Sequence, residues 1–115
     1  MKLGALYADG RCVLPRVWKT TTAWDRLRGL LGRPPLAAGE GLLIEPCASV
    51  HTFGMGYALD LAFIDASWRV SKLVTGLRPA RLAAGLGAAR TLELAAGGLA
   101  QAGLRAGETL TWRET

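Results

Sequence analysis

The chain has 115 residues, of which 50% are hydrophobic and 20% are charged. This composition excludes a disordered or collagen-like chain, and the length indicates a single domain spanning residues 1–115. The net charge of +5 comes from 14 basic residues that form no block and alternate with no aromatic stripe, so we do not expect nucleic-acid binding.

The first elements are set by turn and cap residues. Asp9-Gly10 is a turn dipeptide and predicts a β-hairpin formed by residues 3–8 and 11–14. A helix is predicted next, with Thr22 as its N-cap and Asp25 near its positive end. Trp24, Leu27, Leu30 and Leu31 recur at helical spacing, and we expect the helix to end at Gly32, before Pro34-Pro35.

The remaining chain predicts mostly short strands. Residues 59–64 are the strongest strand signal, because apolar side chains occupy both faces and Asp60 is the one polar exception. A buried polar side chain needs hydrogen bonds, so Asp60 is expected to face a polar pocket, a turn or His51. The other elements are strands at 42–44, 69–77, 90–94 and 109–112, an irregular strand within 47–56, a mobile loop at 78–89 and a short helix at 98–102.

These elements indicate a mainly-β fold, a compact barrel or sandwich of about seven or eight short strands. It would carry one helix in the N-terminal half and one short C-terminal helix. The glycines around Arg28–Arg33 lack the spacing and the preceding strand of a phosphate-binding loop, and we expect no cofactor.

Two cysteines, Cys12 and Cys47, are too few for a disulfide framework and form no CxxC pair. No apolar run approaches the roughly 20 residues that span a bilayer, and the first residues do not form the core of a signal peptide. We therefore expect a cytoplasmic protein with reduced thiols and no membrane attachment, present as a monomer or a weak homo-oligomer.

Several landmarks occur in an order that resembles the family called domain of unknown function 192, a group of small bacterial and archaeal β-rich domains. The resemblance implies a compact mainly-β domain without an established reaction. Leu31 replaces a common methionine, and Gly56-Tyr57-Ala58 lacks the polar side chain and the proline usual there. The matching segments are Arg26–Arg33, Gly41–Ile44, His51–Met55, Leu59–Asp65, Leu92–Gly97 and Gly103–Glu108.

His51 is the only histidine and the natural centre of any acid–base chemistry near neutral pH. We expect a pocket in which His51, Thr52, Asp60 and Arg28 bind a small polar ligand or a protein partner. One alternative is a hydrolase with Cys47 or Ser49 as nucleophile, His51 as base and Asp60 as orienter. A second is a metal site formed by Cys47, His51 and Asp60, and a third is a structural contact between His51 and Asp60.

Other residues are expected to be structural. Phe53, Met55 and Phe63, with Trp24 and Trp112, are predicted to fill the core. Glu93 lies between two leucines and is predicted to form an ion pair with Arg26 or Arg28. Gly29 lies in the matching segment Arg26–Arg33 and Gly97 lies in the matching segment Leu92–Gly97. Both glycines are also expected to have structural roles.

Overall fold

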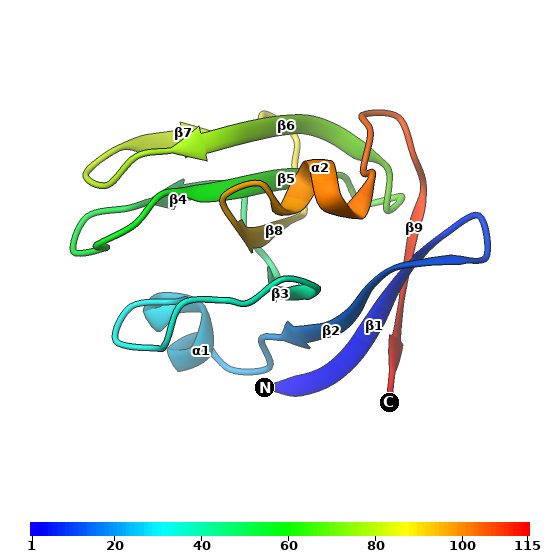
Figure 1. Cartoon of the computed structure of the whole chain (residues 1–115), viewed down its shortest axis with the longest axis horizontal. Helices are drawn as coiled ribbons and strands as arrows, with labels where there is room; N and C mark the ends of the chain where they lie inside the picture. Colours follow the sequence, from blue (N-terminus) through cyan, green and yellow to red (C-terminus); the bar gives the residue numbers. More distant parts are fainter.

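The computed structural model describes residues 1–115 and contains nine strands and two short helices (Figure 1). The helices are α1 (Ala23–Arg28) and α2 (Gly98–Ala102). The strands are β1 (Lys2–Ala8), β2 (Arg11–Lys19), β3 (Glu40–Ile44), β4 (Ser49–His51), β5 (Leu59–Ile64), β6 (Val70–Leu77), β7 (Leu82–Ala84), β8 (Arg90–Ala95) and β9 (Leu110–Glu114).

Seven strands form one mixed sheet in the order β6-β5-β8-β3-β2-β1-β9, and β4 and β7 form a separate antiparallel pair. Only β2 and β3 pair in parallel. The sheet curls until its two edges meet at one point, where the amide of Val70 donates to Glu108 and that of Leu110 donates to Trp68. The sheet does not close along its length into a barrel. The prediction of a mainly-β fold is therefore confirmed, and of the two predicted forms the sandwich is the one that fits.

Hydrophobic side chains cover both faces of the central strands. Leu42 and Leu61 stand opposite Glu93 on the two neighbouring strands, so these three side chains share one face. The other face carries Leu92 and Leu94 and belongs to the larger of two core clusters. The smaller cluster, which contains Leu42 and Leu61, lies beneath β4 and the turn after α1 and supplies the base of the site described below.

The N-terminal hairpin and the strong strand at residues 59–64 form as predicted. The segment predicted to be a mobile loop contains β7, which pairs with β4 and accounts for the ninth strand. Helix α1 begins at the predicted cap, because the Thr22 hydroxyl accepts from the Asp25 amide at 3.0 Å. It ends at Gly29 rather than Gly32, since Gly29 adopts a φ of 53°.

The prediction that aromatic side chains fill the core is correct for Phe63 and wrong for two other aromatic residues. Trp24 and Phe53 are exposed, and α1 buries none of its own side chains. Trp112 is half-buried against the larger cluster, where its indole donates to the Val17 carbonyl at 3.0 Å.

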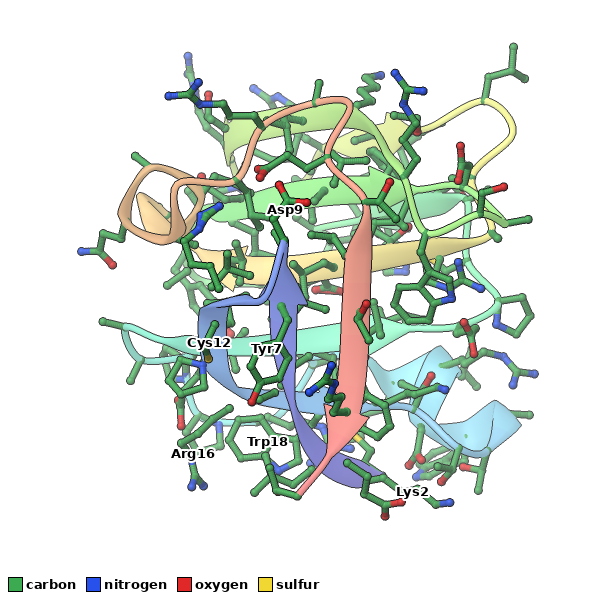
Figure 2. All side chains as sticks on the ribbon, turned by 90° about the vertical axis from the view of Figure 1, so that its right-hand side faces the viewer. Lys2, Tyr7, Asp9, Cys12, Arg16 and Trp18 are labelled. Carbon is green, nitrogen blue, oxygen red and sulfur yellow. The ribbon has the colours of Figure 1, made fainter.

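The outer side of the N-terminal hairpin carries aromatic rings covered by arginines (Figure 2). The guanidinium carbon of Arg16 lies 5.2 Å from the centre of a Trp18 ring, and that of Arg113 lies 5.0 Å from the Tyr7 ring. This part of the positive charge therefore packs on the protein itself. Helix α1 and the β4–β7 pair lie at the opposite end from the β1–β2 turn (Figure 1). Neither α1 nor α2 has the length and hydrophobicity of a membrane-spanning helix.

Candidate functional site

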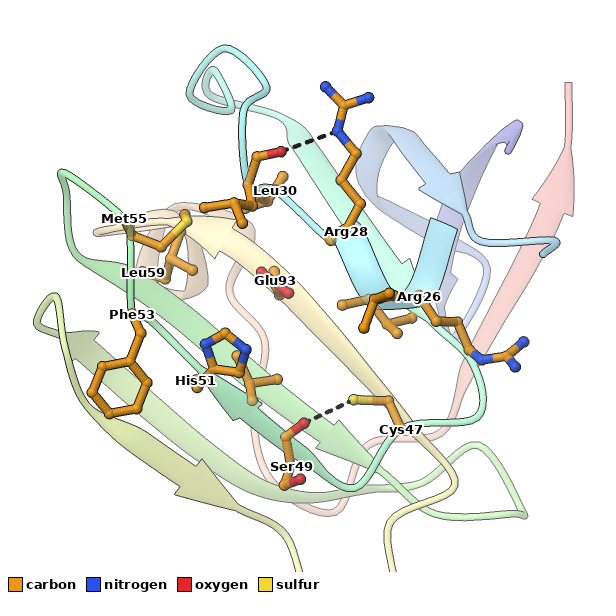
Figure 3. A pocket seen from close by; sticks show the side chains of 15 residues that line it. Arg26, Arg28, Leu30, Cys47, Ser49, His51, Phe53, Met55, Leu59 and Glu93 are labelled. Atoms are coloured by element: carbon orange, nitrogen blue, oxygen red, sulfur yellow. Dashed lines mark hydrogen bonds between the residues drawn. The ribbon is translucent and has the colours of Figure 1, made fainter. Parts of the chain in front are cut away.

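A cavity of about 100 Å³ opens between α1 with its following turn, β4, and the face of the main sheet that carries Glu93 (Figure 3). Its walls are mainly apolar, and its polar groups come from separate elements. The lining residues are Arg26, Leu27, Arg28, Gly29, Leu30, Leu31, Ile44, Cys47, Ser49, Val50, His51, Phe53, Met55, Leu59 and Glu93.

Glu93 forms the floor of this cavity. It lies in the middle of β8, is 4% exposed, and its carboxyl group makes neither a hydrogen bond nor an ion pair within the protein. Burial raises the pKa of Glu93 from 4.5 to about 7, because the apolar surroundings penalise the charged form. The group therefore exchanges a proton near neutral pH and has free hydrogen-bonding capacity.

The predicted ion pair between Glu93 and an arginine of α1 is not formed. Arg26 and Arg28 both line the mouth of the cavity, but their guanidinium groups point away from Glu93 (Figure 3). Arg28 donates to the carbonyls of Leu31 at 3.0 Å and Gly32 at 3.3 Å, which fixes its side chain on the outside of the turn. The six-residue helix presents these side chains to solvent, so no cation reaches the floor.

Exposed apolar side chains surround the opening. Leu27 is 77% exposed, Phe53 is 51% exposed and Leu31 is 45% exposed, and we call these three residues the apolar rim. His51 lines the opening beside them, and its ring lies 5.7 Å from that of Phe53 at a tilt of 35°. Adjacent exposed hydrophobic side chains around a cavity are typical of a surface that contacts a partner.

Asp60 lies on the other face of the sheet and does not contact His51. Its side chain is buried and accepts from the backbone amides of Gly76 at 2.9 Å, Gly97 at 3.1 Å and Leu99 at 3.1 Å. Of the three surroundings expected for Asp60, the structure shows the turn that leads into α2, together with amides of β6 and α2 themselves. The carboxylate joins β6 to the start of α2, and Gly97 has its structural role in this contact.

Thr52 is also buried and is absent from the cavity lining. Its hydroxyl donates to the Arg78 carbonyl at 2.6 Å and accepts from the Arg81 amide at 2.9 Å. These bonds fasten the end of β4 to the chain before β7. The structure thus brings two of the four expected binding residues, His51 and Arg28, to the cavity and places Asp60 and Thr52 elsewhere.

The side chains of the hydrolase alternative lie at the cavity without the contacts that it needs. The Cys47 thiol donates to the Ser49 carbonyl at 3.1 Å (Figure 3), and neither Cys47 nor Ser49 is hydrogen-bonded to His51. No three His, Cys, Asp or Glu side chains gather in a way that could hold a metal ion, so Cys47, His51 and Asp60 do not form the ligand set considered above.

A second polar group of the protein lacks a partner, although it does not line the cavity. The Tyr57 hydroxyl is buried without a hydrogen bond, and its pKa is raised by burial and by the charge of Glu93. Tyr57 belongs to the segment in which the chain departs from the usual family pattern. The sequence predicted only a structural role for Glu93, although a glutamate between two leucines in a strand was a signal of a buried carboxyl group.

Together these features define a small mainly-β domain in which a cavity of side-chain size has a carboxyl group at its floor and an apolar rim. The family model of domain of unknown function 192, described as "Uncharacterized ACR", matches residues 6–112. The chain therefore belongs to this family.

Two crystal structures share the fold. One is described as a "putative transcription regulator" from Sinorhizobium meliloti 1021, with a TM-score of 0.80 and 22% identity over 96% of this chain and 92% of that one. The other is a protein of unknown function from Novosphingobium aromaticivorans DSM 12444, with a TM-score of 0.74 and 21% identity over 96% of this chain and 84% of that one. No curated protein matches the sequence. At these identities the likeness establishes the fold alone.

Proposed function

We propose that this domain is a protein-recognition module whose cavity receives the end of one side chain of a partner polypeptide. The observation that carries the proposal is the combination of the apolar rim with a small open cavity that has an unpaired polar group at its floor. Such a centre resembles the anchor pockets that dominate the binding energy of protein interfaces.

The size of the cavity supports a side chain rather than a whole metabolite. Sites for drug-sized ligands are commonly ~300 to 1,000 Å³, and an apolar cavity of ~150 Å³ holds a benzene molecule. The cavity here measures about 100 Å³, so it accommodates a few non-hydrogen atoms. Its mouth opens to the surface, so a side chain can enter end-on while its backbone remains outside.

The apolar rim supports contact with the residues that flank this side chain. Leu27 comes from α1 and Phe53 from the segment after β4; both line the cavity, and both are more than half exposed. Burial of exposed hydrophobic side chains contributes roughly 25 cal/mol per Å². A peptide lying across the opening would cover both residues.

The hydrolase alternative has less support, because the Cys47 thiol donates to a carbonyl group rather than to an imidazole.

We further propose that the domain acts in the cytoplasm, since Cys12 and Cys47 are both free thiols.

The proposal is tested by selecting phage-displayed random peptides on the wild-type domain and measuring their affinity for variants. Leu27→Asp and Phe53→Asp place a carboxylate on the apolar rim and should weaken the selected peptides about 10-fold or more, the effect expected at a contact of over 1 kcal/mol. Leu86→Asp is the matched control, because Leu86 is also exposed but does not line the cavity.

All three substitutions lie at exposed positions, so each should change the free energy of unfolding by no more than about 0.5 kcal/mol. Selected peptides that bind the rim variants and the wild-type domain equally would contradict the proposed function, as would the absence of any enriched peptide.

A further inference from the structure

We propose that the side chain received by the cavity is cationic, the amine of lysine or the guanidine of arginine, and that Glu93 is the residue that recognises it. This inference rests on the proposed function and specifies the chemistry of the partner. It assigns a binding role to a residue for which the sequence suggested only an internal ion pair.

The first argument is that Glu93 is buried but unpaired. Buried charged side chains are almost always paired, because an isolated carboxylate in apolar surroundings is strongly disfavoured. Glu93 is 4% exposed, yet none of the five ion pairs and none of the hydrogen bonds includes its side chain. A cationic group from outside would supply the missing partner.

The second argument is the shape and lining of the route to Glu93. Leu30, Ile44 and Leu59 form apolar walls around the carboxyl group. Lysine and arginine have aliphatic stems that pack on apolar surface and carry their charge at the tip. A stem lying along these walls would place the charged end at the floor of the cavity.

The third argument is the position of the neighbouring charged and titratable groups. The guanidinium groups of Arg26 and Arg28 are directed to the outside (Figure 3), and Arg28 is held there by two carbonyl groups. From the β4 side, His51 lies at the opening and the Cys47 thiol is bonded to a carbonyl. No cation of the protein therefore competes for Glu93.

The Tyr57 hydroxyl adds a further polar group without a partner in the vicinity of Glu93. Glu93 is acceptor-only when ionised, whereas ammonium and guanidinium groups are donors with three and five N–H bonds. An incoming anion would be repelled by the ionised carboxylate. A neutral amide could donate to Glu93 but would leave its charge unbalanced, so a cation is the better match.

Recognition of a cation by Glu93 has a defined pH dependence. The pKa of Glu93 is raised to about 7 by burial, so the carboxyl group is mostly ionised at pH 8 and mostly protonated at pH 5.5. Binding of a permanently charged ligand should therefore be roughly 10- to 30-fold weaker at pH 5.5 than at pH 8. The cationic side chains themselves stay charged across this interval.

The test uses four blocked amino acids as probes, which are the N-acetyl methylamides of lysine, arginine, norleucine and glutamine. Norleucine reproduces the aliphatic stem of lysine without the charge, and glutamine supplies a neutral donor. Each probe is titrated into the ¹⁵N-labelled full-length domain at pH 8 and pH 5.5, and amide chemical shifts around the cavity report binding. Glu93→Gln removes the charge at constant size, and Glu114→Gln is the matched control at an exposed glutamate outside the cavity.

We expect at least one cationic probe to bind the wild-type domain with an affinity at least about 10-fold higher than that of the norleucine and glutamine probes. The Glu114→Gln variant should show the same difference. Binding should weaken at pH 5.5 and fall at least 10-fold in Glu93→Gln. Equal shifts with norleucine or glutamine, or retention of cation binding in Glu93→Gln, would overturn the inference, as would the absence of shifts with both cationic probes. If selected peptides bind at the apolar rim without any dependence on a lysine or arginine, the inference fails while the proposed function stands.

Discussion

Replacing Glu93 by glutamine should stabilise the protein at alkaline pH and leave its stability nearly unchanged in acid. The variant keeps the size of the side chain but cannot ionise. In the wild-type protein the pKa of Glu93 rises from 4.5 to about 7 on folding, because burial penalises the carboxylate. One pKa unit corresponds to about 1.4 kcal/mol, so the fully ionised group opposes folding by roughly 3 kcal/mol.

The sign follows from proton binding in the two states. Below pH 4.5 Glu93 is protonated in both the folded and the unfolded chain and carries no penalty. Between pH 4.5 and about 7 the unfolded chain releases the proton first, so the free energy of unfolding falls as pH rises. Above the folded pKa the whole penalty is present. The difference between Glu93→Gln and wild type should therefore grow from near zero at pH 4.5 to roughly 3 kcal/mol at pH 8.

Urea unfolding at pH 4.5, 6 and 8 measures this difference, provided that both proteins show the same dependence on denaturant. The exposed Glu114→Gln variant should differ from wild type by no more than about 0.5 kcal/mol at each pH. A difference between Glu93→Gln and wild type that does not change with pH would refute the reasoning, because it would mean that Glu93 has the same pKa in the folded and the unfolded chain.

Three further substitutions test other contacts. Asp60→Ala removes the acceptor of three backbone amides and should lower the free energy of unfolding, measured with urea, by roughly 3 kcal/mol or more. Asp60→Asn should lower it less. A loss below ~1 kcal/mol in Asp60→Ala would count against these hydrogen bonds. Tyr57→Phe deletes a buried hydroxyl without a partner and should raise the free energy of unfolding by about 1 kcal/mol, whereas a loss of that size would reveal a hydrogen bond in solution. Gly85→Ala would place a Cβ in steric overlap with the Phe63 ring and should lower the melting temperature by several degrees. Gly56→Ala meets no atom within 4 Å and should not lower it.

The parts of the fold that were predicted correctly are those specified by neighbouring residues. The Asp9-Gly10 turn and the two apolar faces of residues 59–64 depend on local chemistry, and both form as expected. Strand β7 was missed because a three-residue strand has too little periodicity and exists only through its pairing with β4. The parallel pairing of β2 with β3 could not be predicted from local residue patterns either, since it joins segments separated by α1 and its following turn.

The site illustrates the limits of the same reasoning. His51 lines the cavity, whereas Asp60 was assigned to the same site only because the two residues are close in sequence. Strand alternation puts Asp60 on the opposite face from Leu59 and Leu61. Glu93 was singled out as a polar residue among leucines. Its pairing with an arginine failed because a helix of six residues keeps Arg26 and Arg28 on the surface.

Helix α1 has a thermodynamic consequence for any partner of the cavity. It is too short to be stable alone, and none of its own side chains is buried, so its first turn depends on the Thr22 cap and its end on Gly29. Few buried contacts make such an element one of the first to open locally. The measured affinity would then include the free energy of ordering this wall, and amide exchange in α1 should slow on binding. Substitutions at Thr22, which does not line the cavity, would thereby alter affinity from a distance.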